Sequence, residues 1–92
     1  RLFDLAQRLR GAREELAVVD EQLQALSETA EDARVRSLVS ETPLAHREYT
    51  EARRHLDALG RAQRALASSI AEMQANQDEL LDRLLSDDHQ RR

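Results

Sequence analysis

Apolar residues recur at alternating spacings of three and four along the first third of the chain. The positions are Leu2, Leu5, Leu9, Ala12, Leu16, Val19, Leu23, Leu26, Ala30 and Ala33. This is the heptad pattern of a helix that packs its apolar side against a partner helix. We therefore predict a long helix, and we call this set of positions the first seam.

A second seam with the same spacing runs along the other half of the chain. It comprises Tyr49, Ala52, Leu56, Leu59, Gln63, Leu66, Ile70, Met73, Gln77, Leu80 and Leu84. The polar residues Gln63 and Gln77 weaken such a seam, but residues of this kind fix register and partner number. Gly60 lies inside the predicted helix, where glycine lowers helix stability by roughly 1 kcal/mol relative to alanine. It either allows close packing or is simply tolerated.

Between the two seams the chain contains its only proline, Pro43, in the stretch Ser40-Glu41-Thr42-Pro43. Proline breaks a helix interior but suits the first helical turn, and Thr42 is a good N-cap for a helix that begins there. We therefore predict one hairpin over residues 1–88, with arms over about 2–40 and 43–86 and a turn at 41–43. Residues 89–92 are predicted to be a frayed tail.

The apolar pattern changes after Ala33, and two arrangements fit it. Continuing the heptad would place Ser37 and Ser40 in the seam, whereas the apolar residues there are Val35, Leu38 and Val39. Either the first helix runs to about Ser40 with its apolar stripe rotated, or a separate short helix covers roughly 29–40. An arm of about 60 Å, at 1.5 Å per residue, matches the second arm and favours the continuous helix.

The predicted fold is an all-α antiparallel coiled-coil hairpin. Folding at the turn brings Leu26 near Leu56–Leu59 and Leu5 near Leu80. A lone hairpin buries only one stripe per helix, and helices owe most of their stability to tertiary packing. We therefore expect two hairpins to pair into a helical bundle, with a second face supplied by Ala58, Ala62, Ala65 and Leu81.

Composition narrows the classes of protein. The 92 residues are 35% charged and 2% aromatic, with neither cysteine nor lysine. A chain without cysteine has no disulfide, catalytic thiol or cysteine-based zinc site, and we expect a cytoplasmic protein. Neither a membrane span nor a signal peptide is predicted. All-arginine positive charge is typical of high-GC bacterial genomes. Whether a segment precedes Arg1 is left open.

Charge is uneven along the chain. Residues 33–64 carry seven arginines and four acids, whereas the rest carries seven arginines and fourteen acids. The basic half surrounds the predicted turn. One interpretation is a solvated surface with local ion pairs such as Asp57–Arg53. The other is a docking surface for an acidic protein or a phosphate-bearing ligand, with partner-binding candidates Arg34, Arg36, Glu41, His46, Arg47, Tyr49, Arg53 and Arg54.

Catalytic and metal motifs are not found in the sequence. The three histidines, at positions 46, 55 and 89, are spaced too far apart for one helical metal site. A thin hairpin also lacks the concave pocket that acid–base catalysis needs. We therefore expect no enzyme, no metal and no cofactor. Duplex nucleic acid is not an expected partner, because the net charge is −4 and no aromatic platform is present.

The predicted function is that of a protein–protein interaction module, a small bacterial adaptor or regulator that docks on a larger complex through its arginine-rich tip. A hairpin of this length resembles the secondary-channel regulators of bacterial RNA polymerase, which present acidic residues at the tip. Here Glu41 stands at the turn, while the surrounding tip is basic. The resemblance implies a regulator that binds RNA polymerase or a sigma factor. The further alternatives are a sensor of an anionic nucleotide and a purely structural oligomerisation coiled coil.

Overall fold

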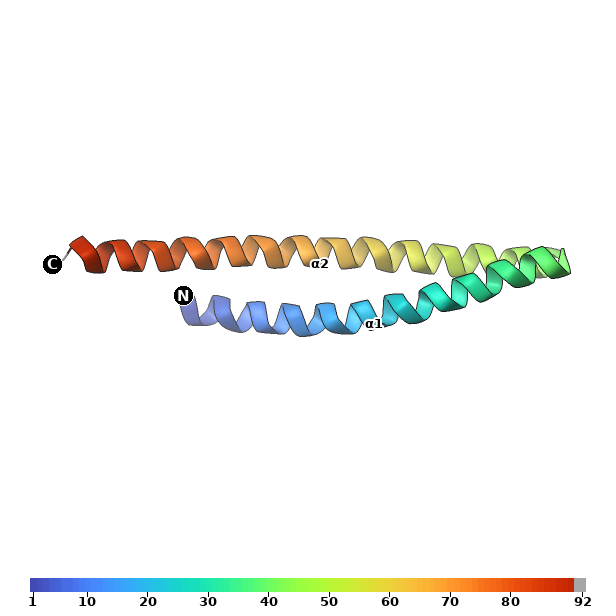
Figure 1. Cartoon of the computed structure of the whole chain (residues 1–92), viewed down its shortest axis with the longest axis horizontal. Coiled ribbons are helices and arrows are strands. Elements are labelled where there is room, and N and C mark those ends of the chain that lie inside the picture. The colour runs from blue at the N-terminus through green and yellow to red at the C-terminus, as the bar shows by residue number, and fades with distance from the viewer. Residues whose placement is uncertain (91–92) are drawn as a thin grey trace.

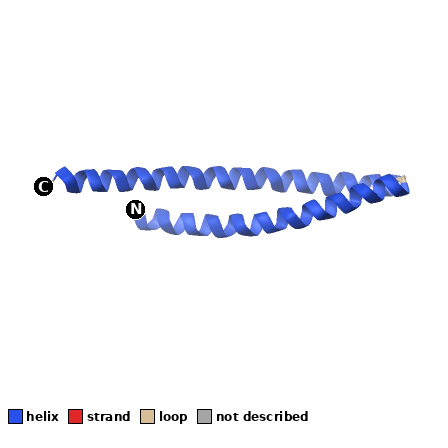
Figure 2. Cartoon of the chain, in the orientation of Figure 1, coloured by secondary structure: helices blue, strands red, loops and turns tan. Residues whose placement is uncertain are grey.

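The protein is a helical hairpin in the computed structural model, which describes the backbone of residues 1–90 and the side chains of residues 1–88. Helix α1 spans Leu2–Ser40 and helix α2 spans Pro43–Gln90. The two helices run antiparallel in a rod measuring 75 × 14 × 14 Å (Figure 1). Over the described residues the only loop joins the two helices (Figure 2). This confirms the predicted all-α hairpin.

The two seams form the interface between the helices. Every first-seam position is buried or half-buried, with Leu5, Leu9, Ala30 and Ala33 the most enclosed. Polar side chains bridge the helices at the rim of this interface. Gln63 Nε2 donates to Asp20 Oδ1 at 2.7 Å, and the Arg13 guanidinium donates to the Gln74 side-chain carbonyl. The heptad spacing therefore marks the contact surface of α1.

The predicted rotation of the apolar stripe after Ala33 is wrong. Helix α1 does continue unbroken to Ser40, as the favoured arrangement predicted, and the alternative of a separate short helix over roughly 29–40 is not present. Ser37 continues the seam and is 3% exposed, and its hydroxyl donates to the Arg34 carbonyl oxygen at 2.7 Å. Val35 and Val39 are exposed instead. A serine whose hydroxyl is satisfied by its own helix can enter the interface, so the heptad does not need to rotate.

Small residues in the interface allow the two helices to approach each other closely near the turn. The second seam begins at Ala45, which is 9% exposed, four residues earlier than the pattern indicated. Ala45 joins the buried Ala30, Ala33 and Ser37. Figure 1 shows α1 crossing close against α2 in this region. Short side chains allow this approach, which leaves the longer apolar residues of the same segment in solvent.

The turn consists of Glu41 and Thr42. Glu41 adopts the left-handed conformation, with φ 49° and ψ 30°, and its N–H donates to the Ser37 carbonyl oxygen at 3.2 Å. Thr42 is the N-cap of α2, because its Oγ1 accepts a hydrogen bond from the Ala45 N–H at 3.1 Å. The left-handed residue ends α1, and the threonine begins α2 in the next position.

Helix α2 is longer than predicted and extends beyond the first residues of α1 (Figure 1). It includes His89 and Gln90, which had been assigned to a frayed tail, while residues 91 and 92 of that tail lie outside the described part. Leu84 was expected in the second seam but is 56% exposed. It lies where α1 no longer flanks α2. Within the described residues, neither helix has a stretch long and apolar enough to cross a membrane.

Candidate interaction surface at the tip

The tip, defined here as residues 34–54, contains all eight partner-binding candidates. Three of them meet in one open groove between the helices. Arg34 of α1 and Tyr49 and Arg53 of α2 line this groove of about 380 Å³, together with Leu56 on its apolar side. Tyr49 is half-buried, as its place in the second seam requires. The groove is therefore lined by one phenol and two guanidinium groups.

Arg34 is engaged within its own helix. Its guanidinium forms a forked contact with Glu31, with Nε to Oε2 at 3.0 Å and Nη2 to Oε1 at 2.6 Å. The hydrogen bond from Arg34 lowers the pKa of the Glu31 carboxyl from its ordinary value of 4.5. Both side chains are about half exposed, so the pair contributes little to stability. Glu31 and Arg34 both line the groove, so the pair forms part of its wall.

Arg53 is held in the same way on α2. Its Nη1 donates to the Tyr49 hydroxyl at 3.3 Å, and its Nε lies 3.6 Å from Asp57 Oδ1. The hydrogen bond with Tyr49, supported by the nearby Asp57 carboxylate, raises the pKa of Arg53. The pairing of Arg53 with Asp57 is the local ion pair that the sequence indicated. The groove arginines are thus largely satisfied by their own helices.

The remaining candidates are spread around the tip and do not converge. Arg47 stands two residues from both Ala45 and Tyr49, which is about 200° around the helix and so opposite the seam. Arg54 follows seven residues later on the same outer face of α2. These two arginines, with Arg36 on α1, are exposed and form no ion pair within residues 1–88. His46 is exposed on α2, and Glu41 is part of the turn.

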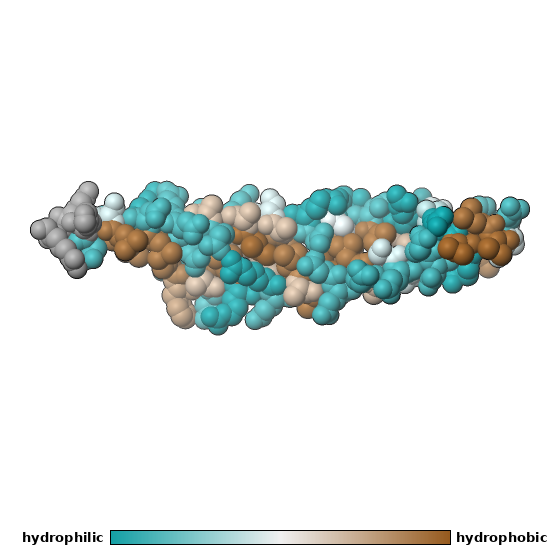
Figure 3. All heavy atoms as spheres, viewed as in Figure 1, coloured by the Kyte–Doolittle hydropathy of each residue, from teal (hydrophilic) through white to brown (hydrophobic). Residues whose placement is uncertain are grey.

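Four large apolar side chains also stand in solvent at the tip, which sequence reasoning missed. They are Val35 at 47% exposed, Leu38 at 62%, Val39 at 80% and Leu44 at 61%. We call them the apolar tip cluster, and Figure 3 shows an apolar patch at this end of the rod. The available signal was that all four fall outside the heptad positions of their helices. The tip is thus both apolar and basic.

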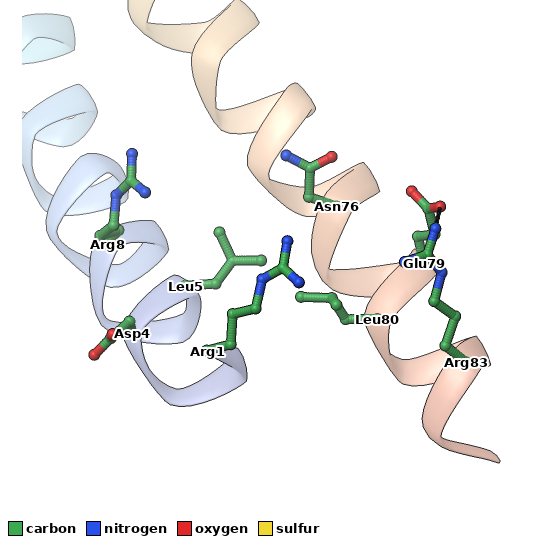
Figure 4. Close-up of a pocket in the computed structure, with 8 residues that line it drawn as sticks. All are labelled: Arg1, Asp4, Leu5, Arg8, Asn76, Glu79, Leu80 and Arg83. Carbon is green, nitrogen blue, oxygen red and sulfur yellow. Dashed lines mark hydrogen bonds and ion pairs between the residues drawn. The ribbon is translucent and has the colours of Figure 1, made fainter. Parts of the chain in front are cut away.

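A second groove lies at the opposite end of the hairpin, and Arg1 and Arg8 are among the residues that line it (Figure 4). Its volume is about 440 Å³, and Leu5 and Leu80 extend toward each other across it. The predicted pairing of these two leucines is therefore present. Arg83 donates to Glu79 at 2.6 Å within α2. The groove lies where the interface between the two helices ends. None of the eight partner-binding candidates lines it.

Neither metal-binding geometry nor similarity to known proteins assigns a function to the chain. Among the described residues, no group of three or more histidine, aspartate or glutamate side chains is placed to hold a metal ion. The chain matches no family model, and neither the curated proteins nor the solved structures contain a match to it. The geometry of the tip therefore carries the functional argument.

Proposed function

We propose that this protein is a non-catalytic protein–protein interaction module that docks on its partner through the tip. The observation that carries the proposal is that exposed apolar side chains and unpaired arginines share this small region. Val39 is 80% exposed, and Arg47 and Arg54 form no ion pair within residues 1–88. Exposed apolar residues rimmed by polar ones are typical of interaction sites.

The chemistry of the tip indicates the chemistry of its partner surface. The partner surface would have an apolar centre that covers Leu38, Val39 and Leu44. Burying these side chains supplies the main driving force for association. The arginines on the outer face of α2 match carboxylates at the rim, where charge complementarity governs specificity and association rate. The expected partner is a protein surface with apolar residues bordered by acidic ones.

We also propose that the hairpin acts as a pair of copies in a helical bundle. One face of the rod carries apolar atoms at intervals along its length (Figure 3). The central seam residues Leu16, Leu23 and Leu66 are only half-buried in the single hairpin. A second layer of helices would remove this surface from water. The proposed dimer is therefore a consequence of the incomplete burial in one hairpin.

The docking proposal is tested with a double variant, Arg47→Ala and Arg54→Ala, in affinity capture from cell extract followed by mass spectrometry. The matched control is Arg8→Ala with Arg10→Ala, which removes two exposed arginines from the opposite end of α1. We expect the tip variant to lose proteins that the wild type and the control retain, with equal helicity by circular dichroism in all three. Equal capture by all three proteins would refute docking through these arginines.

A further inference from the structure

The surface chemistry that complements the tip is present on the chain itself, on the C-terminal part of α2. From Asp78 to Asp88 the helix carries five acids against one arginine, Arg83. Arg83 is already engaged by Glu79. Asp82, Asp87 and Asp88 are exposed and form no ion pair within residues 1–88. This acidic segment, residues 78–88, is the counterpart in charge of the arginine-rich tip.

The acidic segment also exposes apolar side chains. Leu81 is 41% exposed, Leu84 is 56% and Leu85 is 68%. Leu80 is the last position of α2 that remains half-buried against α1, and each described side chain after it is exposed. The three leucines thus stand on a helix that extends past its partner, surrounded by carboxylates. An apolar centre with an acidic rim is the surface that the tip requires.

The two complementary regions lie at opposite ends of one face. Figure 3 shows apolar atoms at the tip and near the far end of α2 in a single view, with further apolar atoms between them. Turning a second copy end for end over this face would place each apolar region on the other. A face 75 Å long and 14 Å wide offers more than the roughly 800 Å² that each partner buries in a stable interface.

We infer that the partner of the tip is a second copy of this chain, bound antiparallel, so that the apolar tip cluster of each copy covers the acidic segment of the other. The inference rests on the proposed function and names the partner of that surface. The arrangement has twofold symmetry and is closed, since each copy gives one tip and one acidic segment. In it, each tip, whose residues 34–54 carry an excess of arginine, lies at the same end of the pair as the other copy's acidic segment.

The absence of cysteine from the chain permits a direct test by cross-linking. Val39→Cys marks the tip and Leu84→Cys marks the acidic segment, and both positions are exposed. The two full-length variants, one carrying an affinity tag, are mixed and treated with a short bismaleimide. We expect the mixed tip-to-segment product to exceed either same-site product at least about tenfold, a difference of about 1.4 kcal/mol in preference. Light scattering should give twice the 10.5 kDa mass of one chain.

Charge exchange supplies a second measurement. The variant with Arg47→Glu and Arg54→Glu should dimerise more weakly than the wild type when alone, and so should the variant with Asp87→Arg and Asp88→Arg, because each removes the charge difference between the ends that meet. A mixture of the two variants should dimerise. In the mixed pair, one tip-to-segment contact keeps the wild-type charges, and the other joins opposite charges whose signs are exchanged. Rising salt should weaken the wild-type dimer, as expected for exposed charges.

Several outcomes would overturn the inference. A single-chain mass, a predominant tip-to-tip product, or an open series of oligomers larger than dimers each contradicts the closed antiparallel pair. These results differ from a failure of the proposed function. A hairpin that captures another protein through Arg47 and Arg54, yet shows no mixed cross-link, keeps the docking proposal and loses the self-pairing. A mixed cross-link without arginine-dependent capture of another protein supports self-pairing alone.

Discussion

Gln63 of α2 and Asp20 of α1 are joined by a hydrogen bond of 2.7 Å midway along the hairpin. Gln63 occupies a seam position, where a leucine would bury more apolar surface. The amide instead reaches the rim and binds a carboxylate on the opposite helix. A polar residue at such a position selects one alignment of the helices at a cost in stability. The pair therefore fixes which residues of the two seams face each other.

The variant Gln63→Leu should consequently be more stable than the wild type. Leucine at this half-buried position adds apolar burial of about 1 kcal/mol. Asp20 is exposed and stays hydrated when its partner is removed. Urea unfolding followed by circular dichroism measures the change. Asp20→Ala is the control, and it should alter the unfolding free energy by less than about 0.5 kcal/mol. A lower urea midpoint for Gln63→Leu would contradict the role of Gln63 as a residue that trades stability for register.

Removing the N-cap of α2 should destabilise the hairpin. In Thr42→Ala the Ala45 N–H loses the hydroxyl that it now binds, at a cost of about 1 kcal/mol. Thr50→Ala is the matched control, because the Thr50 hydroxyl bonds back to the His46 carbonyl oxygen inside the helix. That bond does not satisfy a backbone group left unpaired at a helix end. Thr50→Ala should therefore leave the stability of the hairpin unchanged or raise it. Thermal melts of the two variants should therefore shift in different directions or by clearly unequal amounts.

Replacing the left-handed residue at the turn with glycine should raise the stability of the hairpin. Glu41 has a side chain at φ 49°, a region that costs a non-glycine residue roughly 1 kcal/mol. Glu41→Gly should recover up to about 1 kcal/mol, because glycine enters this conformation without the steric cost and is favoured at helix C-termini. Glu41→Val should lose stability, because a β-branched side chain fits this region worst. The order Gly above Glu above Val in chemical denaturation is the expected result, and any other order argues against strain at this residue.

Two glycines inside the helices should be replaceable. A Cβ at Gly60 would meet only the end of the Arg64 side chain at 3.5 Å, and a Cβ at Gly11 would have nothing within 4 Å. Close packing of the helices therefore does not require Gly60, and the residue is tolerated. Each alanine variant should stabilise the protein by roughly 0.5–1 kcal/mol through helix propensity. A destabilised Gly60→Ala beside a stabilised Gly11→Ala would indicate a second surface packed on Gly60, as in a dimer.

The acid titration of Glu31 should depend on Arg34. The forked hydrogen bond lowers the pKa of Glu31 in the folded protein below its ordinary value of 4.5. The pair therefore stabilises the fold above the unfolded-state pKa, and this contribution disappears as the pH falls through the folded-state value. Carboxyl carbon NMR titration should show the lowered pKa in the wild type and its return toward 4.5 in Arg34→Gln. An unchanged titration would mean that the pair does not persist in solution.

The heptad spacing was sufficient to predict the hairpin, because burial of one stripe per helix determines how two long helices pack. Seam residues from Leu2 to Ala33 were identified correctly for this reason. For the segment after Ala33 the sequence left two arrangements open, because the apolar residues there leave the seam. Ser37 entered the interface while Val39 did not, since a close approach of two helices selects small side chains over hydrophobic ones. The heptad register, when continued past Ala33, already separates the two residues, because it places Ser37 in the seam and Val39 outside it.

The candidate site was predicted less completely than the fold. The sequence placed Arg34, Tyr49 and Arg53 at one end of the hairpin, and the structure gathers them in one groove. Arg36, Arg47 and Arg54 were also predicted to bind a partner, yet helical rotation directs Arg47 and Arg54 to the outer face of α2. Proximity to a turn brings residues to one end of a rod, but the angular position of each decides which surface it joins. The apolar tip cluster was not predicted as a surface, because Val35, Leu38 and Val39 were interpreted only as a change in the apolar stripe and Leu44 was not considered.

The length of α2 also determines how this protein behaves hydrodynamically. The radius of gyration is 21.2 Å. A globular chain of this length would have a radius of gyration near 12 Å. A rod of such dimensions diffuses slowly for its mass and elutes early in gel filtration, so a single hairpin resembles a much larger sphere. Elution volume alone would thus report a false oligomer for the monomer.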